Sequence, residues 1–236
     1  MPSTGQRNIG LLGGTFNPIH RCHLTLAREV RSRLRLDHML FVPTGDPPHK
    51  QDGNLVAAPH RMEMVRLAIE GEQSFAVSDI EVRRTGRSYS IDTVLELQRE
   101  LGPETELYFC LGLDAFLDLE SWRRPADLLR TCHFVVVSRP GAQFDRLSRL
   151  SLLPRLDDES LHRLDVGRID TQSFPLDTGR MLHLLTMAPC TVSASMIRDR
   201  LRQGLGVEGL LPHSVERYII RMGLYQERDN PTRFEG

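Results

Sequence analysis

Two histidines near the N-terminus stand at a spacing that could bring both imidazoles to one ligand. The segment IGLLGGTFNPIHRCHL, residues 9–24, runs from an apolar stretch through a glycine turn to His20 and His23. If a helix begins there, positions i and i+3 share one face, so both rings point into the same volume. Imidazoles at a helix N-terminus could donate hydrogen bonds to phosphate oxygens, and the helix dipole adds positive potential. The residue types therefore indicate an anion site.

The turn before these histidines suits a close approach between backbone and ligand. Gly13 and Gly14 carry no side chain that would hold a ligand away from the backbone. We expect Asn17 to be the N-cap of the following helix, with Pro18 in its first turn. The structural alternative is a tight turn followed by two partly exposed histidines.

A zinc site is the other chemistry that His20, Cys22 and His23 could support. At i+2 Cys22 points away from the histidine face, and no fourth ligand follows at a usual spacing. The pattern therefore favours phosphate over zinc.

A second candidate anion site lies far along the chain, in TVSASMIRDRL at residues 191–201. Ser193 and Ser195 stand where a helix should begin, and they offer caps and hydroxyl donors. Arg198 falls near the first turn, where a cation opposes the helix dipole unless an anion binds at the same place. The alternative is that Arg198 pairs with Asp199 or with solvent.

Alternating apolar runs and helical stripes must position these residues. The runs are continuous and rich in Val, Ile, Leu and Phe, as expected for strands covered on both faces. Such strands are predicted at 9–12, 39–42, 75–77, 107–111, 134–137 and 182–187, with helical patterns at 24–34, 62–69, 91–101, 195–203 and 213–222. The order predicts an α/β fold, a doubly wound and mostly parallel sheet. Ligands in such folds bind at the carboxyl ends of the strands, here after Gly13–Gly14 and after Gly112.

The segment 142–180 mixes charges and leucines with little strand character, and we interpret it as an inserted, partly helical excursion. We expect residues 1–190 to form one Rossmann-like domain that contains this excursion. Residues 191–236 should form a C-terminal helical region that completes the anion site.

Composition excludes several classes of protein. The chain has 236 residues, 40% of them hydrophobic, and a formal charge of -1, so no general basic field attracts nucleic acid. No apolar stretch is long enough to span a membrane, and residues 1–8 lack the apolar core of a signal peptide. Cys110 and Cys132 lie in apolar runs, which indicates buried thiols in a reducing compartment. We expect a cytoplasmic protein without nucleic-acid or membrane partners, with a homo-oligomer left open.

Taken together, six motifs resemble one family over nearly the whole chain, from Ile9 to Tyr225. GGTFNPIHRCH and VSASMIR resemble the HxGH nucleotidyltransferase superfamily. The motifs PTGDPPHK, SYSIDT, LGLDAFLDLESW and VVSRPG, with the tail LLPHSVERYIIRMGLY, are similar to bacterial nicotinate-nucleotide adenylyltransferases. The resemblance implies transfer of AMP from ATP to nicotinate mononucleotide in NAD biosynthesis, giving deamido-NAD and pyrophosphate, with Mg²⁺ accompanying ATP.

The resemblance also implies a role for each matching residue. The residues expected to bind ATP are Gly13, Gly14, Thr15, Phe16, Gly112, Asp114, Ser193 and Ser195. The catalytic group implied is His20, His23, Lys50 and Arg198, and Lys50 is the only lysine of the chain. His49, Tyr89, Ser90 and Trp122 are expected to bind the nicotinate nucleotide, with Trp122 stacked on the pyridine ring. Because the attacking phosphate is already an oxyanion, the reaction needs positioning and charge stabilisation, with no covalent intermediate.

Three alternatives stay open. Cys22 stands where the family usually has glycine, so the chain could be a catalytically weak nucleotide-binding homologue. The acceptor could be nicotinamide mononucleotide or another phosphate. IGLLGGT also faintly resembles a dinucleotide-binding turn, but its GxGxxG spacing fails.

Overall fold

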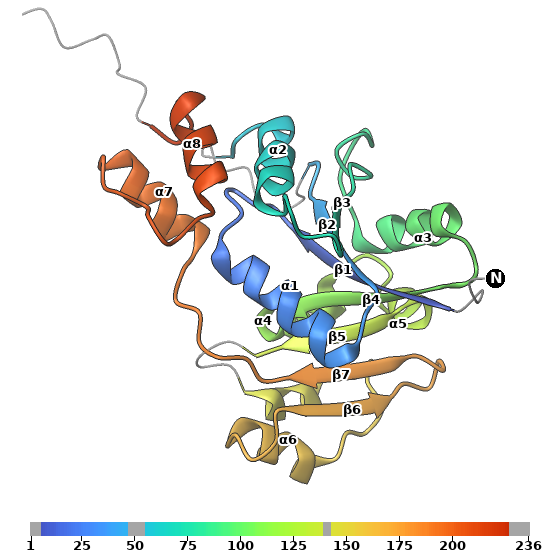
Figure 1. The fold of residues 1–236 in the computed structure, drawn as a ribbon. Helices are drawn as coiled ribbons and strands as arrows, with labels where there is room; N and C mark the ends of the chain where they lie inside the picture. Colours follow the sequence, from blue (N-terminus) through green and yellow to red (C-terminus); the bar gives the residue numbers. More distant parts are fainter. Residues whose placement is uncertain (1–5, 47–54, 139–142, 227–236) are drawn as a thin grey trace, which may run out of the picture.

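The structure is a computed structural model that describes residues 6–46, 55–138 and 143–226. Seven strands form one sheet in the order β3-β2-β1-β4-β5-β7-β6 (Figure 1). The strands are β1 (Arg7–Gly14), β2 (His38–Pro43), β3 (Phe75–Val77), β4 (Thr105–Gly112), β5 (His133–Val137), β6 (Thr171–Pro175) and β7 (Met181–Leu185). All pairs are parallel except β6 with β7. The α/β fold with a mostly parallel sheet is confirmed.

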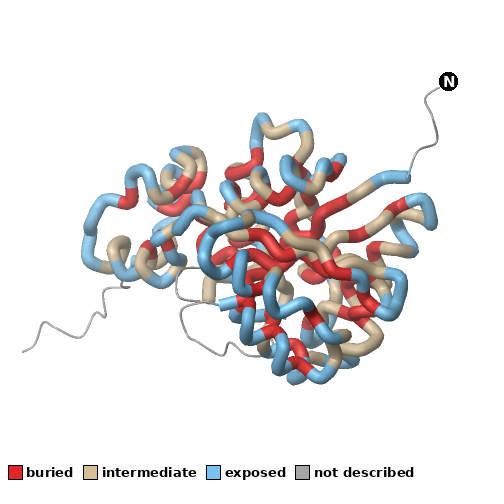
Figure 2. The backbone as a smooth tube through the Cα atoms, turned by 90° about the horizontal axis from the view of Figure 1, so that it is seen from below, coloured by how far each residue is buried: buried red, intermediate tan, exposed pale blue. Residues whose placement is uncertain are grey.

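Helices cover both faces of the sheet. The helices are α1 (Arg21–Leu34), α2 (Ala58–Ala68), α3 (Ser90–Leu101), α4 (Leu113–Leu117), α5 (Pro125–Thr131), α6 (Asp158–Asp165), α7 (Ala194–Arg202) and α8 (His213–Arg221), with short 3₁₀ turns η1 (Leu119–Ser121) and η2 (Phe144–Arg149). One core cluster joins the sheet to α3, α4, α5 and α6, and the other joins it to α1, α2, α7 and α8. Figure 2 shows the buried backbone gathered in the middle of the molecule, with exposed turns around it.

The strand order reverses between β1 and β4, and this switch point positions the site. β1 pairs with β2 on one side and with β4 on the other, so chain connections lead away in opposite directions. In such sheets a crevice opens where the two carboxyl ends diverge. The glycines at the ends of these two strands, Gly14 and Gly112, therefore lie where the sequence predicts a ligand.

The sequence prediction of segment 142–180 is wrong about its strand content. It contains η2 and α6, as a partly helical segment should, but it also supplies β6 at the edge of the sheet. Phe144, Leu147, Leu161 and Leu164 belong to the same core cluster as Phe134 of β5. This part of the chain is packed into the main core.

The buried face of α2 is partly as the helical pattern at 62–69 predicts. Val65 and Ile69 of that pattern are buried, whereas Met62 is only partly buried and Arg61 is buried in addition. Arg61 turns inward to bind backbone carbonyls, which no apolar periodicity can indicate.

A half-buried histidine on β7 should make stability depend on pH. His183 Nδ1 lies 2.7 Å from Ser173 Oγ, its Nε2 is buried without a partner in the described part of the chain, and its ring faces Tyr108 and His133. Burial lowers the pKa of His183 to about 4, with a smaller contribution from His133. Protonation therefore favours the unfolded chain, so this stability is complete above the unfolded pKa near 6.5 and is lost as pH falls towards 4.

We expect His183→Gln to remove that part of the pH dependence. In the wild type the single site contributes roughly 3 kcal/mol to the loss of unfolding free energy between pH 7.5 and 4. Urea unfolding of wild type and variant across this range measures the difference. Glu106 and Arg180, which pair with each other beside His133, stay unchanged in both proteins. Equal pH slopes for the two proteins would contradict the assignment.

Candidate active site at the sheet switch point

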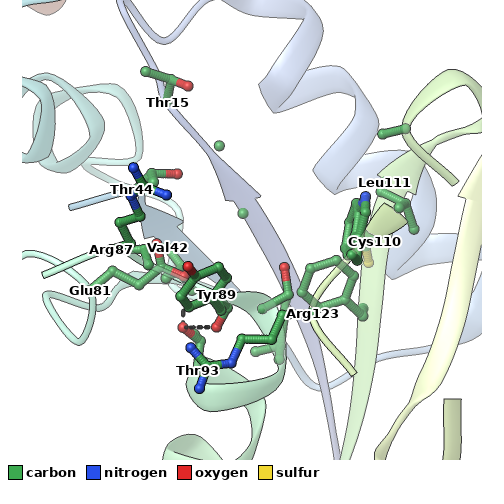
Figure 3. Close-up of a pocket in the computed structure, with 18 of the residues that line it drawn as sticks. Thr15, Val42, Thr44, Glu81, Arg87, Tyr89, Thr93, Cys110, Leu111 and Arg123 are labelled. Atoms are coloured by element: carbon green, nitrogen blue, oxygen red, sulfur yellow. Dashed lines mark hydrogen bonds between the residues drawn. The ribbon is translucent and has the colours of Figure 1, made fainter. Parts of the chain in front are cut away.

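A cavity of about 720 Å³ opens at the carboxyl ends of β1 and β4. Its walls come from the ends of β1, β2 and β4, the segment before α3, and the turn after α4. Among the predicted site residues it collects Gly13, Gly14, Thr15, Tyr89, Ser90 and Trp122. Figure 3 shows Glu81, Arg87 and Tyr89 along one side of the pocket and Cys110 and Leu111 of β4 on the other. Residues far apart in sequence thus meet where the fold predicts a ligand.

The glycine turn of β1 leaves room in this cavity. A Cβ added to Gly13 would meet nothing within 4 Å, so any side chain there would project into open space beside the turn. A Cβ on Gly14 would lie 3.1 Å from the ring of Phe16, which is tighter than ordinary contact. Gly13 therefore leaves space for a ligand, and Gly14 allows Phe16 to pack.

Trp122, Tyr89 and the N-terminus of α3 form another wall of the cavity. Tyr89 is the N-cap residue of α3 and Ser90 is its first residue, so the positive end of the helix dipole points at the cavity. Trp122 follows η1, and its ring packs edge-on against Phe109 with centroids 6.1 Å apart. The predicted neighbourhood of Trp122, Tyr89 and Ser90 is thus present in space. It suits a flat aromatic ring that carries an anionic substituent.

Two arginines in the same wall were not predicted as site residues. The guanidinium carbon of Arg123 lies 4.6 Å from the centroid of the Tyr89 ring, a cation–π geometry. Arg87 also lines the cavity. Arg123 is adjacent to Trp122 in sequence, which was the only signal available. The pair brings positive charge to the end of the cavity near Tyr89.

A buried carboxyl supports this wall. Glu81 is 8% exposed, and its Oε1 accepts a hydrogen bond of 2.7 Å from Thr93 Oγ1. Burial raises the pKa of Glu81, while hydrogen bonding and the charge of Arg84 act in the opposite direction. Gly45 packs directly against this segment, since an added Cβ would lie 2.0 Å from the Glu81 carbonyl oxygen.

A buried arginine fixes the loops at the mouth of the site. Arg61 is 1% exposed and donates to three carbonyls, those of Val56 at 2.9 Å, Thr15 at 2.7 Å and Gly45 at 3.1 Å. These bonds tie the turn after β1 to the loop after β2 and to the start of α2. The loops are therefore held in place before any ligand binds.

The two histidines do face one another, but the helix begins later than predicted. His20 is the N-cap of α1, and the ring centroids of His20 and His23 are 3.8 Å apart. The backbone N–H of His20 donates to His23 Nδ1 over 3.2 Å. Because Nδ1 accepts, a neutral His23 carries its proton on Nε2 and can donate from there.

Asn17 lies in the turn before α1 and is not its N-cap, which corrects the sequence prediction. Its Oδ1 accepts from the backbone N–H of Val56 at 3.2 Å and from Tyr225 Oη at 2.8 Å. Its backbone carbonyl accepts from Arg198 Nη1 at 2.8 Å. Asn17 thus connects the turn to the α2 side and to the C-terminal helices.

Phe16 was predicted to bind ATP, but its side chain lies in the core. It is 2% exposed, packs edge-on against His23 with centroids 5.1 Å apart, and has φ of 46°. Because its ring packs against His23, we assign Phe16 the role of holding that side chain in place.

The late motif forms the N-terminus of α7 and contacts the turn before α1. Ser193 is the N-cap of α7 and accepts from the backbone N–H of Met196 at 3.2 Å. Arg198 reaches the turn at Asn17, and its Nη2 lies 3.5 Å from Ser195 Oγ. Asp199 pairs with Arg202, so Arg198 is not its partner. Within the described residues Arg198 Nε is buried and has no hydrogen-bond partner, which leaves a donor for a ligand.

The remaining predicted residues either do not line the cavity or lie outside the residues that the structure describes. Gly112 is the N-cap residue of α4, and Asp114 lies exposed in its first turn; neither lines the cavity. His49 and Lys50 lie outside the described residues. In the described ranges, no group of three or more His, Cys, Asp or Glu side chains is placed to hold a metal ion.

The cysteines confirm one expectation and add a finding. Cys110 and Cys132 are free and buried, as predicted. Cys22, however, forms a disulfide with Cys190, 168 residues further along the chain. The two cysteines are too far apart in the sequence for a spacing pattern to predict this pair.

Fold and site together define a nucleotidyltransferase: a parallel sheet with a glycine turn, paired histidines and a serine–arginine helix N-terminus at one edge. The chain matches the model of the cytidylyltransferase-like family over residues 11–200. A probable nicotinate-nucleotide adenylyltransferase of Pelobacter propionicus is 43% identical over 93% of this chain and 98% of its own length. One of Moorella thermoacetica is 39% identical over 93% of this chain and 92% of its own. The chain therefore belongs to the nicotinate-nucleotide adenylyltransferases.

Solved structures show the same fold. The nicotinic acid mononucleotide adenylyltransferase of Plasmodium falciparum, complexed with NaAD, superposes with a TM-score of 0.67 at 22% identity and covers 93% of this chain and 97% of its own. The structure of a protein from Vibrio parahaemolyticus, described as a putative nicotinate-nucleotide adenylyltransferase, gives a TM-score of 0.60 at 15% identity and covers 94% of this chain and 96% of its own. No helix in the described part of the chain is long and apolar enough to cross a membrane.

Proposed function

We propose that this protein transfers AMP from ATP to nicotinate mononucleotide, giving deamido-NAD and pyrophosphate. The observation that carries the proposal is the pairing of two unlike sites at one sheet edge. One is a cavity with Trp122, Tyr89 and two arginines. The other is a cluster of His20, His23 and Arg198 around the turn after β1. An aromatic anion suits the first site, and a phosphate chain suits the second.

We assign the cavity to the acceptor nucleotide. Trp122 offers an aromatic face for the pyridine ring, and Ser90 at the α3 N-terminus offers donors for its carboxylate. Burial raises the pKa of the Glu81 carboxyl, which accepts a hydrogen bond from Thr93 Oγ1 in this wall. Arg87 and Arg123 favour an anionic ring substituent over a neutral amide.

We assign the second cluster to the phosphates of ATP. In-line attack by the acceptor phosphate on the α-phosphorus displaces pyrophosphate and increases charge on the transferring oxygens. His20 and His23 would donate hydrogen bonds to these oxygens, and Arg198 with Ser193 and Ser195 would bind the leaving pyrophosphate. Lys50, outside the described residues, retains its predicted role beside the phosphates.

We propose Mg²⁺ as the ion that accompanies ATP. Magnesium keeps several waters and is commonly bound through substrate phosphates, where it neutralises negative charge. The protein's part is then to orient the phosphates through His20, His23 and Arg198. We assign Gly112 and Asp114, at the start of α4, to binding the adenosine part of ATP.

The cellular setting is part of the proposal as well. Substrates of this kind are free metabolites, so we place the enzyme in the cytoplasm. We also propose that residues 1–190 form a nucleotidyltransferase domain and residues 191–236 a C-terminal region. The support for this division is that Arg198 of α7 completes the phosphate cluster from the second part.

Pyrophosphate release tests the reaction and the acceptor together. Purified protein with ATP and Mg²⁺ is expected to release pyrophosphate rapidly with nicotinate mononucleotide and slowly with nicotinamide mononucleotide. Equal rates with the two acceptors would overturn the specificity. No release with either, while ATP still binds, would overturn the activity and favour a catalytically weak homologue.

Arg123→Leu is expected to reduce the preference for the nicotinate acceptor. The substitution keeps bulk near Tyr89 but removes the cation, so kcat/KM for the carboxylate substrate should fall roughly tenfold or more. The value for the amide substrate should change little, since an amide gains less from the charge. Arg124→Leu is the matched control, because Arg124 pairs with Asp127 on the exposed side. An unchanged ratio of the two acceptors in Arg123→Leu would contradict this role.

A further inference from the structure

The disulfide joins the two halves of the phosphate cluster. Cys22 is the second residue of α1, between His20 and His23, and Cys190 lies three residues before Ser193, the N-cap of α7. The two Cα atoms are 5.8 Å apart, within the usual range for a disulfide. The bond therefore ties the start of α1 to the start of α7.

The chain between β7 and α7 has no regular secondary structure, but Thr186 and Met187 bond to Asp170 and Ser138, and Val192 is buried. Residues 186–193 form no helix or strand, and in Figure 1 this segment runs from the end of β7 past α1 to reach α7. Contacts that do not involve the disulfide also hold the C-terminal helices, including Arg198 to the Asn17 carbonyl and the Arg21 N–H to the Leu210 carbonyl. Breaking the disulfide should therefore loosen the α7 N-terminus without unfolding the protein.

The four cysteines differ in their access to solvent. Cys22 and Cys190 are partly exposed, whereas Cys110 and Cys132 are 1% and 0% exposed. Burial also raises the pKa of the Cys132 thiol to about 12, and the pKa of Cys110 is raised for the same reason. Because the thiolate is the reactive form, only the first pair can exchange readily with a reagent in solution.

We propose that Cys22 and Cys190 are a reversible dithiol–disulfide modification site that sets the affinity of the protein for ATP, with the disulfide as the tight-binding form. The disulfide holds Ser193 and Ser195, at the N-terminus of α7, beside the start of α1, while Arg198 is also held by its bond to the Asn17 carbonyl. In the dithiol form ATP must order the α7 N-terminus as it binds, and that ordering lowers its affinity. Neither cysteine lines the acceptor cavity, so the affinity for the acceptor should stay the same.

The chemistry needs a small disulfide, such as oxidised glutathione, as the oxidant. One cysteine thiolate attacks a sulfur of the small disulfide, forms a mixed disulfide and releases one small thiolate. The second cysteine thiolate attacks the protein sulfur of that mixed disulfide, closes the protein disulfide and releases the second small thiolate. Two electrons pass to the small disulfide, and the two cysteine protons end on the released thiolates. A dithiol reductant reverses the sequence.

The test compares ATP binding by the two redox forms of the full chain. Protein treated with oxidised glutathione and protein treated with dithiothreitol are titrated calorimetrically with Mg²⁺–ATP and, separately, with nicotinate mononucleotide. We expect the dissociation constant for ATP to rise roughly fivefold or more on reduction, while that for the mononucleotide stays unchanged. Alkylation and mass measurement should find two newly reactive thiols, at Cys22 and Cys190, in the reduced form.

Variants separate this proposal from general effects of the reductant. Cys190→Ser should bind ATP as the reduced wild type does and should show no redox response. The variant Cys132→Ala, which removes a buried thiol that does not line the cavity, should keep the full response. An ATP dissociation constant that is the same in both redox forms, or an equal change for both ligands, would overturn the proposal.

The proposal builds on the assigned ATP site, but it can fail separately from the proposed reaction. Pyrophosphate release without a redox effect on ATP affinity would retain the activity and overturn the modification site. A redox effect on ATP affinity without pyrophosphate release would retain the modification site and overturn the proposed activity.

Discussion

Replacement of His20 or His23 by alanine is expected to lower kcat/KM for adenylyl transfer by roughly 30- to 900-fold. This corresponds to about 2–4 kcal/mol of transition-state stabilisation, the typical effect of losing one preorganised donor to a developing oxyanion. The acceptor's own affinity should be retained, because neither histidine lines the acceptor cavity. Steady-state kinetics with each substrate varied in turn measures both quantities.

The arrangement of the two rings explains why the effect should be large. His23 accepts the backbone N–H of His20 on Nδ1, so a neutral His23 carries its proton on Nε2. The ring of Phe16 packs against His23 from the core side and limits its rotation. The donor is thus oriented before the reaction begins, which is the condition under which a hydrogen bond contributes most to a transition state.

Two further variants separate a catalytic role from a structural one. His20→Asn keeps a residue that can cap α1 but lacks an imidazole, so it should fold well and remain slow. His38→Ala removes an exposed histidine at the start of β2 and should leave the rate unchanged. His20→Ala and His23→Ala variants with rates within about threefold of the wild type would refute the assignment.

The sequence predicts the sheet well because most of its strands are continuous apolar runs. All six predicted strands are present, and the third begins and ends at the predicted residues, Phe75 and Val77. β6 was missed because the segment Thr171–Pro175 is polar and lies at the sheet edge, where only Phe174 is buried. An edge strand pairs on one side only and needs little apolar character.

Local motifs in the site are predictable, whereas contacts between distant segments are not. The meeting of Trp122 with Tyr89 and Ser90 was expected from the family resemblance, and the capping role of Ser193 from its residue type and position. The N-cap role assigned to Asn17 was wrong, because its side chain binds Val56 and Tyr225. Propensity describes what a residue does with its chain neighbours, and tertiary partners can override it.

The same limit applies to Arg61 and to the Cys22–Cys190 disulfide, whose contacts sequence reasoning missed. Arg61 occupies a position where the helical stripe should be apolar, and it binds three carbonyls from three separate segments. Cys22 and Cys190 are 168 residues apart, and no spacing rule joins them. In each case the partner is determined by the fold as a whole, so it becomes visible only in three dimensions.

Arg198→Met is expected to lower kcat/KM by roughly 100- to 1,000-fold, mainly through weaker binding of ATP. The variant loses the charge that we place on the leaving pyrophosphate, and it also loses the bond to the Asn17 carbonyl at 2.8 Å. Charge-assisted contacts to phosphate are among the strongest hydrogen bonds in proteins, and removal of one commonly costs several kcal/mol. The rise should appear in KM for ATP, and KM for the mononucleotide should stay near its wild-type value.

Comparison with neighbouring arginines on the same helix tests whether the position, rather than the charge of α7, matters. Arg202→Met removes an arginine that pairs with Asp199 on the surface, so it should leave kcat/KM within about twofold of wild type. Arg198→Lys keeps the charge but offers a point donor in place of a planar fork, so its activity should lie between those of Arg198→Met and wild type. Equal losses in Arg198→Met and Arg202→Met would show a general electrostatic effect, and the assignment of Arg198 to the phosphates would then be wrong.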